Sequence, residues 1–270
     1  MNKLLKVLGM LGVAWGVLST APAMAQQACS LEPTAGTVTR TIGSRSYTLN
    51  VPAGLVGGSV PLLIALHGGG SNPSFHENET GWTPYAASHN FIVAYPKALN
   101  AWWDLTDNSV DTPFLKQVAA DISSQWCVDP KRIHVAGFSR GGMMSHRVAC
   151  DDDGTFASVA PYAGYLPTAE FASCSPQRKV PVAIFHSTFD PIVPYFRATA
   201  ARDFWKTNNG CTGSVTTTVN GSAFERYTGC AGGTEVWLRQ YFQSHNWPFG
   251  SDADDIRNRM WAFFQAHPLP

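Results

Sequence analysis

The sequence predicts an α/β fold in which about eight strands form a mostly parallel sheet with helices on both faces. Short apolar runs, such as residues 61–66 and 91–95, are typical of strands buried on both sides. They alternate along the chain with segments of helical periodicity, which is the pattern of a parallel sheet. A third observation is the Gly-x-Ser-x-Gly stretch at residues 137–141, which stands between an apolar β-branched run and a helical pattern. This stretch predicts a strand, a sharp turn and a helix.

The first 25 residues predict an export signal. Lys3 and Lys6 precede an apolar run, and small residues lead up to Ala25, so we expect cleavage after that residue. The apolar run is short for a bilayer and is interrupted by glycines, which argues against a membrane anchor. Residues 26–270 have the length of one large α/β domain, and no linker, charge run or repeat divides them. We therefore expect a single domain in a secreted protein, extracellular or periplasmic.

The elements of the predicted fold follow in order. The strands are expected at residues 37–42, 45–51, 61–66, 91–95, in the run that leads into residue 137, and at 156–160, 180–186 and 235–242. The first two alternate in polarity and are joined by a Gly-Ser pair suited to a tight turn, so we expect an antiparallel hairpin at the edge of the sheet. Helices are expected over residues 114–126, from the Gly-x-Ser-x-Gly stretch to about residue 150, and over 251–266.

Ser139 is the candidate nucleophile. A strand-turn-helix elbow forces the serine into a strained backbone conformation, so glycine is needed two residues to either side. The turn leaves the backbone N–H of Arg140 at a helix N-terminus, where it could bind a developing oxyanion. A second donor could come from Gly68 and Gly69 in the His-Gly-Gly-Gly loop that follows a central strand. An ordinary glycine-rich loop is the alternative interpretation of that segment.

Asp190 and His245 are the candidate acid and base. Asp190 follows the seventh predicted strand, and parallel strands share their carboxyl ends, so its carboxylate is expected at the same edge as Ser139. An Asp-Pro turn residue is the alternative. His245 follows the last strand, whereas His267, the other histidine after Asp190, belongs to the terminal tail. The chain order serine, aspartate, histidine is that of an α/β-hydrolase triad and predicts acyl transfer through a serine nucleophile.

Aromatic residues near these strand ends are candidates for substrate binding. Trp102 and Trp103 follow the fourth strand, and Tyr195 and Trp247 lie in the loops of the candidate acid and base. Their rings could stack on an aromatic acyl group, although packing in the core is the commoner role of such residues. The chemistry requires no metal and no organic cofactor, and no Cys-x-x-Cys or cysteine-histidine cluster has the spacing of metal ligands.

Charge and cysteine content restrict the partners and the compartment. The formal net charge is zero, so nothing predicts nucleic-acid binding. All six cysteines follow residue 25, and an even number in an exported chain predicts three disulfides. A local hairpin-like excursion and two adjacent strands suggest two of the pairs, and the third follows by elimination. The expected pairs are Cys211–Cys230, Cys150–Cys174 and Cys29–Cys127.

Four segments carry a resemblance to a known group of proteins. They read HGGG at residues 67–70, GFSRGG at 137–142, HSTFDPIVPY at 186–195 and HNWP at 245–248. They resemble motifs of the secreted esterases of the polyhydroxybutyrate depolymerase and feruloyl esterase group, and the likeness covers nearly all of the expected mature chain. The chain departs from that group at Ser187, at Gln243-Ser244 and at Phe249, where glycine is common. These departures affect the mouth of the pocket and leave every catalytic group in place.

The resemblance implies an α/β-hydrolase fold and hydrolysis of carboxylic esters in extracellular polymers. The interpretation we favour is a feruloyl or acetylxylan esterase that acts on plant cell-wall polysaccharide. A polyester depolymerase is the first alternative, and a secreted acyltransferase that passes the acyl group to an alcohol is the second. A non-catalytic binding protein is disfavoured because all three catalytic residue types are present. We expect a monomer whose partner is an ester-bearing polymer or oligomer, without membrane contact after signal cleavage.

Overall fold

The computed structural model describes residues 35–55, 58–151, 154–166 and 173–270. The predicted export signal at residues 1–25 and Cys29 lie outside these ranges. Within the described residues, no helix has the length and apolar character needed to cross a membrane.

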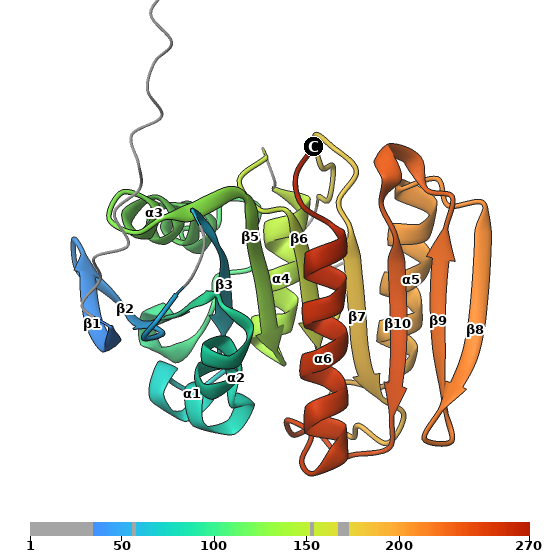
Figure 1. The fold of residues 1–270 in the computed structure, drawn as a ribbon. Coiled ribbons are helices and arrows are strands. Elements are labelled where there is room, and N and C mark those ends of the chain that lie inside the picture. The colour runs from blue at the N-terminus through green and yellow to red at the C-terminus, as the bar shows by residue number, and fades with distance from the viewer. Residues whose placement is uncertain (1–34, 56–57, 152–153, 167–172) are drawn as a thin grey trace, which may run out of the picture.

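One sheet of ten strands, counted over the described residues, runs through the molecule in the order β1-β2-β4-β3-β5-β6-β7-β10-β9-β8 (Figure 1). The strands are β1 (Gly36–Ile42), β2 (Arg45–Val51), β3 (Val60–Leu66), β4 (Ile92–Pro96), β5 (Val128–Phe138), β6 (Ser158–Tyr162), β7 (Val182–Ser187), β8 (Gly213–Val219), β9 (Ser222–Thr228) and β10 (Val236–Tyr241). The six central strands, β4, β3, β5, β6, β7 and β10 in their order across the sheet, are mutually parallel. The antiparallel β1–β2 hairpin closes one edge, as the sequence predicts.

Helices cover both faces of the sheet (Figure 1). They are α1 (Pro73–Thr80), α2 (Trp82–His89), α3 (Asp111–Ser123), α4 (Arg140–Cys150), α5 (Phe196–Asn208) and α6 (Ser251–Ala266), with short 3-10 turns η1 (Leu99–Ala101) and η2 (Ala231–Gly233). Apolar side chains of α3, α4 and α5 pack in the core on one face, and those of α2 and α6 pack in a second core on the other. The predicted α/β fold with helices on both faces is therefore confirmed.

The strand count differs from the prediction because a second antiparallel hairpin extends the sheet beyond β10. Strand β9 pairs with β10, and β8 pairs with β9. Asn220 and Gly221 form the two-residue turn between them, and both have positive φ, 49° and 77°. Such a turn matches the twist of the two strands it joins. The two hairpin strands account for the difference between eight and ten.

Two of the three expected disulfides are present. Cys211–Cys230 joins the two ends of the β8–β9 hairpin. Cys150–Cys174 ties the C-terminus of α4 to the segment that precedes β7. The third pairing, Cys29–Cys127, stays a prediction because Cys29 lies outside the described residues.

The parallel strands bring four loops to one edge of the sheet, the lower edge in Figure 1. Strands β3, β5, β7 and β10 run in the same direction, so their carboxyl ends lie together. Strand β3 is buried along its whole length, which fixes the start of the glycine loop that follows it. The segments that carry the candidate nucleophile, acid and base leave β5, β7 and β10 at this edge.

Candidate active site

Ser139 occupies the turn between β5 and α4 in a strained conformation. Its φ is 54° and its ψ is −117°, a region that residues with side chains rarely adopt. A Cβ on Gly137 would collide with the backbone of Gly141, and one on Gly141 would collide with the backbone of Leu66. Glycine is therefore required at both positions. Although strand, turn and helix pack closely here, Ser139 is only partly buried.

The structure brings Ser139, His245 and Asp190 together. His245 Nε2 lies 2.8 Å from Ser139 Oγ, and His245 Nδ1 lies 2.7 Å from Asp190 Oδ2. A carboxylate only accepts hydrogen bonds, so the Nδ1–H group donates to Asp190 and Nε2 is left to accept the serine proton. This is the tautomer that a general base requires.

Asp190 is held as a carboxylate by its surroundings. Burial by itself would raise its pKa, but hydrogen bonds from His245 and from backbone N–H groups outweigh that effect, so the pKa of Asp190 lies below its usual value. The backbone donors are Ile192 and Val193, each 2.8 Å from Oδ1. Both oxygen atoms are thus engaged, and the side chain is fully buried.

Of the three residues predicted to supply backbone donors, Arg140 and Gly68 lie next to Ser139, and Gly69 follows Gly68 in the glycine loop. Arg140 is the first residue of α4, where backbone N–H groups have no partner within the helix. A Cβ added to Gly68 would lie 3.6 Å from Ser139 Cβ, so this loop runs directly beside the candidate nucleophile. A Cβ on Gly69 would lie only 2.8 Å from the Trp102 ring. Glycine at this position therefore lets the tryptophan close over the loop.

The four predicted substrate-binding residues differ in their exposure to solvent: two are buried and two are at least partly exposed. The prediction for Trp103 is wrong, because its side chain is fully buried and its indole donates to the carbonyl of His67. Trp247 is only 5% exposed and packs edge-on against Tyr162, so it anchors the His245 loop to the core. Trp102, by contrast, is 55% exposed. Tyr195 is half-buried, and its ring lies edge-on to His186.

Sequence reasoning missed an exposed apolar rim at this edge. Phe189 and Ile192 follow β7, Phe242 follows β10, and all three are about half exposed or more. The rings of Phe189 and Phe242 lie 5.8 Å apart, centre to centre. We call these three residues and Trp102 the apolar rim. The signal in the sequence was the presence of large apolar residues directly after strand ends, where polar loops are usual.

Two further histidines, His67 and His186, contact residues of the site, and no pattern in the sequence indicated a role for them. His67 Nδ1 lies 2.7 Å from the carbonyl of Gly68, and its Nε2 accepts from the backbone N–H of Ala98. Burial lowers the pKa of His67 to about 4, so the ring is neutral and fixes the glycine loop. His186 lies behind Asp190, with its Nε2 3.6 Å from Asp190 Oδ2.

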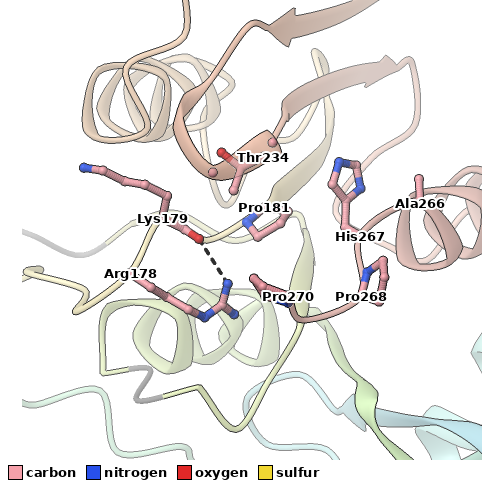
Figure 2. Close-up of a pocket in the computed structure, with 10 residues that line it drawn as sticks. Arg178, Lys179, Pro181, Thr234, Ala266, His267, Pro268 and Pro270 are labelled. Carbon is pink, nitrogen blue, oxygen red and sulfur yellow. Dashed lines mark hydrogen bonds between the residues drawn. The ribbon is translucent and has the colours of Figure 1, made fainter.

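A separate cavity lies at the opposite edge of the sheet. Its volume is about 190 Å³, and Arg178, Lys179, Thr234 and His267 contribute to its lining (Figure 2). These residues precede β7 and β10 or follow α6, so they lie at the amino ends of the strands, far from Ser139. Among the described residues, no cluster of three or more histidine, cysteine or acidic side chains could hold a metal ion.

Comparison with known proteins identifies the family. Residues 96–226 match the family described as Phospholipase/Carboxylesterase. Feruloyl esterase D of Neurospora crassa is 30% identical over 279 aligned residues, which cover 92% of this chain and 94% of that protein. Feruloyl esterase B of Piromyces equi is 30% identical over 72% of this chain and 41% of its own length. The chain spans less than half the length of this and two other curated relatives.

Solved structures show the same architecture. The acetyl xylan esterase of Aspergillus awamori superposes with a TM-score of 0.68 at 13% identity, over 86% of this chain and 100% of that one. At this identity the likeness concerns the fold alone, and it agrees with the mostly parallel sheet covered by helices on both faces. The chain therefore belongs to the carboxylesterases of the α/β-hydrolase group, in the family that includes feruloyl esterase D.

Proposed function

We propose that this chain is a secreted serine esterase that hydrolyses feruloyl or acetyl esters of plant cell-wall polysaccharide. The observation that carries the proposal is the position of His245, with one ring nitrogen 2.8 Å from Ser139 Oγ and the other 2.7 Å from Asp190 Oδ2. Serine is a poor nucleophile at its free pKa, and this contact supplies the base that activates it.

Acylation starts from the hydrogen bond between Ser139 and His245. As Ser139 Oγ attacks the ester carbonyl, His245 Nε2 takes its proton, and the buried Asp190 carboxylate stabilises the imidazolium. The carbonyl oxygen becomes an oxyanion, for which the backbone N–H groups of Arg140, Gly68 and Gly69 are the proposed donors. One such donor typically contributes about 3 kcal/mol to the transition state. His245 then protonates the leaving alcohol, and the acyl group stays on the serine.

Deacylation repeats these proton transfers through His245, with water as the attacking group and Ser139 as the leaving group. A water molecule gives a proton to His245 Nε2 as its oxygen attacks the acyl carbonyl, and the tetrahedral intermediate again places its negative oxygen among the backbone donors. Collapse of the intermediate breaks the bond to Ser139 Oγ, which regains the proton from His245. The carboxylic acid leaves, and the resting hydrogen bond forms again.

Three features support the choice of substrate and compartment. Two relatives that align over most of this chain are named feruloyl esterases. The apolar rim offers exposed aromatic rings in the loops that follow β4, β7 and β10, at the sheet edge where Ser139 lies, which suits a phenolic acyl group. The two disulfides suit an oxidising compartment outside the cytosol, as the predicted export signal requires.

Ester hydrolysis by Ser139→Ala tests the mechanism. We expect the wild-type protein to hydrolyse methyl ferulate and p-nitrophenyl acetate, and the variant to lose about a million-fold in kcat. Ser88→Ala, at an exposed serine of α2, is the matched control and should retain full activity. Ester cleavage by Ser139→Ala at more than a thousandth of the wild-type rate would contradict the proposed nucleophile.

Substrate choice is tested with the wild-type protein on a panel. Preference for methyl ferulate over hydroxybutyrate oligomers is the expected result. The opposite preference would support the polyester depolymerase alternative. Transfer of the acyl group to added alcohol in place of water, measured by product analysis, would support an acyltransferase.

A further inference from the structure

Two buried histidines lie behind Asp190 and take no part in the proposed reaction. His186 is in β7 and His146 is in α4, and neither is exposed to solvent. His146 stacks against Trp205 of α5, and His186 lies edge-on to Tyr195 just before that helix. Both rings therefore occupy the sheet face that α4 and α5 cover.

The tautomer of His146 follows from its partner. The indole Nε1 of Trp205 lies 3.0 Å from His146 Nδ1. An indole can only donate, so Nδ1 carries no proton, and the neutral ring must carry its proton on Nε2. Burial, together with the nearby His186, lowers the pKa of His146 to about 3, so the ring is neutral at ordinary pH. His146 Nε2–H is consequently a hydrogen-bond donor.

The tautomer of His186 follows in the same way. Its Nε2 lies 2.8 Å from the carbonyl of Val193, and a carbonyl can only accept. The proton is thus on Nε2, directed toward Val193 and, at 3.6 Å, toward Asp190 Oδ2. Burial lowers the pKa of His186 as well, which keeps the ring neutral. His186 Nδ1 is consequently a hydrogen-bond acceptor.

The two remaining ring nitrogens are complementary. His146 Nε2 and His186 Nδ1 are buried, and neither has a hydrogen-bond partner among the described residues. One is a donor and the other an acceptor, both rings lie on the sheet face that α4 and α5 cover, and buried polar groups are almost always paired. Because neither nitrogen lies within direct hydrogen-bond distance of the other, we propose that one buried water accepts from His146 Nε2–H and donates to His186 Nδ1, and that the resulting relay from Trp205 through His146 and His186 positions Asp190.

The relay connects the nucleophile helix to the acid loop. His146 belongs to α4, which begins directly after Ser139, and His186 holds Val193, whose N–H donates to Asp190 Oδ1. A fixed His186 therefore fixes both the backbone that orients the carboxylate and the carboxylate itself. This inference rests on the proposed function, because it assigns His146 and His186 as positioning residues for the Ser139, His245 and Asp190 triad.

A matched pair of variants separates positioning from folding. His146→Leu breaks the relay, whereas His134→Leu removes an equally buried histidine of β5 on the opposite face, where it stacks on Phe264. The pKa of His134 is also lowered to about 3 by burial. We expect both variants to lower the unfolding temperature by similar amounts. Only His146→Leu should lower kcat, by about fivefold at unchanged KM, the factor that corresponds to one hydrogen bond.

A second pair tests His186 by conservative rescue. Glutamine can place an N–H group where His186 Nε2–H lies, so His186→Gln should retain more of kcat than His186→Leu. Equal kcat in these two variants, or equal losses in His146→Leu and His134→Leu, would overturn the proposal.

The tautomers give a readout that does not depend on activity. Nitrogen-15 NMR of the resting wild-type protein at pH 7 should show His146 and His186 both protonated on Nε2 and unprotonated on Nδ1. A proton on Nδ1 of either ring would overturn the relay even if the protein is an active esterase. Conversely, a wild-type protein that has these tautomers but hydrolyses no ester would contradict the proposed function and leave the water-bridged pair in place.

Discussion

The backbone strain at Ser139 has a structural basis in two backbone hydrogen bonds. Its N–H donates to the carbonyl of Tyr162 at 2.9 Å, and its carbonyl accepts from the N–H of Met143 at 2.9 Å. A conformation of this kind costs about 1–3 kcal/mol and persists only where the surroundings enforce it. The strands and helix on either side enforce it here, so the hydroxyl is already directed at His245 before substrate arrives. For the proposed reaction this geometry is a form of preorganisation, which would lower the cost of reaching the transition state.

Replacing Asp190 by asparagine tests the proposed role of the carboxylate. An amide N–H facing His245 would favour the tautomer with Nδ1 as acceptor, and Nε2 would then carry a proton and could not accept one from Ser139. We expect kcat to fall about 10³- to 10⁴-fold in Asp190→Asn with little change in the unfolding temperature. Asp254→Asn, at an exposed position of α6, is the control. A loss of less than tenfold would show that another group orients His245.

For individual residues, the sequence predicts which polar side chains come together better than it predicts which aromatic side chains are exposed to solvent. The serine, aspartate and histidine were assigned from their places after strands, and the structure places all three within hydrogen-bond distance in series. The adjacent Trp102 and Trp103 show the limit. They lie after a 3-10 turn without periodicity, so no pattern could indicate that the second enters the core and the first faces solvent.

Among the elements, the buried central strands and helices α3, α4 and α6 were predicted, whereas strands β8 and β9 and helices α1, α2 and α5 were missed. Strand β3 and helix α6 show the expected burial. Strand β8 is exposed over most of its length, so its threonine-rich sequence shows no alternation of apolar and polar residues that would indicate a strand. The Asn220-Gly221 pair was the available signal for the hairpin. Helix α1 is mostly polar and its phenylalanine, Phe75, is exposed, so it shows no apolar face. Asn72 caps it by accepting from the N–H of Phe75, and an Asn-Pro start indicates such a helix.

The loops after β7 and β10 carry a prediction about substrate preference. Phe189 is 68% exposed and Phe242 is 49% exposed, with their rings in contact. If a phenolic acyl group stacks on this pair, Phe189→Ala and Phe242→Ala should each lower kcat/KM for methyl ferulate by about three- to tenfold. The value for p-nitrophenyl acetate, whose acyl group is too small to reach the pair, should change little.

The control for this test is Val215→Ala, an exposed apolar residue on β8 at the far edge of the sheet. It should leave both substrates unaffected. Parallel losses for ferulate and acetate in the phenylalanine variants would show that the pair stabilises the acid and base loops and takes no part in selecting the acyl group.

In the whole molecule, a single sheet with a core on each face determines where the polar groups can be. The parallel pattern predicted this arrangement, because continuous apolar strands must be covered on both sides. It did not predict that several histidines would be enclosed in those cores. His134 and His146 are fully buried on opposite faces, and their partners, Ser158 and Trp205, come from distant elements. Such pairs depend on tertiary packing that local sequence patterns do not encode.

The buried histidines predict that stability falls on mild acidification. Burial lowers the pKa of His134 and His146 to about 3 and that of His67 to about 4, whereas the unfolded chain has histidine pKa values near 6.5. Between these values the unfolded state binds protons and the folded state does not, so the free energy of unfolding decreases as the pH falls below about 6.5. Below about 4, protonation of carboxylates with lowered pKa, such as Asp190, adds to the loss.

Urea unfolding followed by tryptophan fluorescence at pH 7 and pH 5 measures this effect. Each of the three histidines should contribute a loss on the order of 1–2 kcal/mol between these pH values. His134→Gln removes one titrating group outside the candidate site, so its free energy of unfolding should decrease less over the same interval, by about the share of one histidine. Equal stability of the wild-type protein at pH 7 and pH 5 would mean that these rings are hydrated in the folded state, and the two-core description of the sheet would then have to be revised.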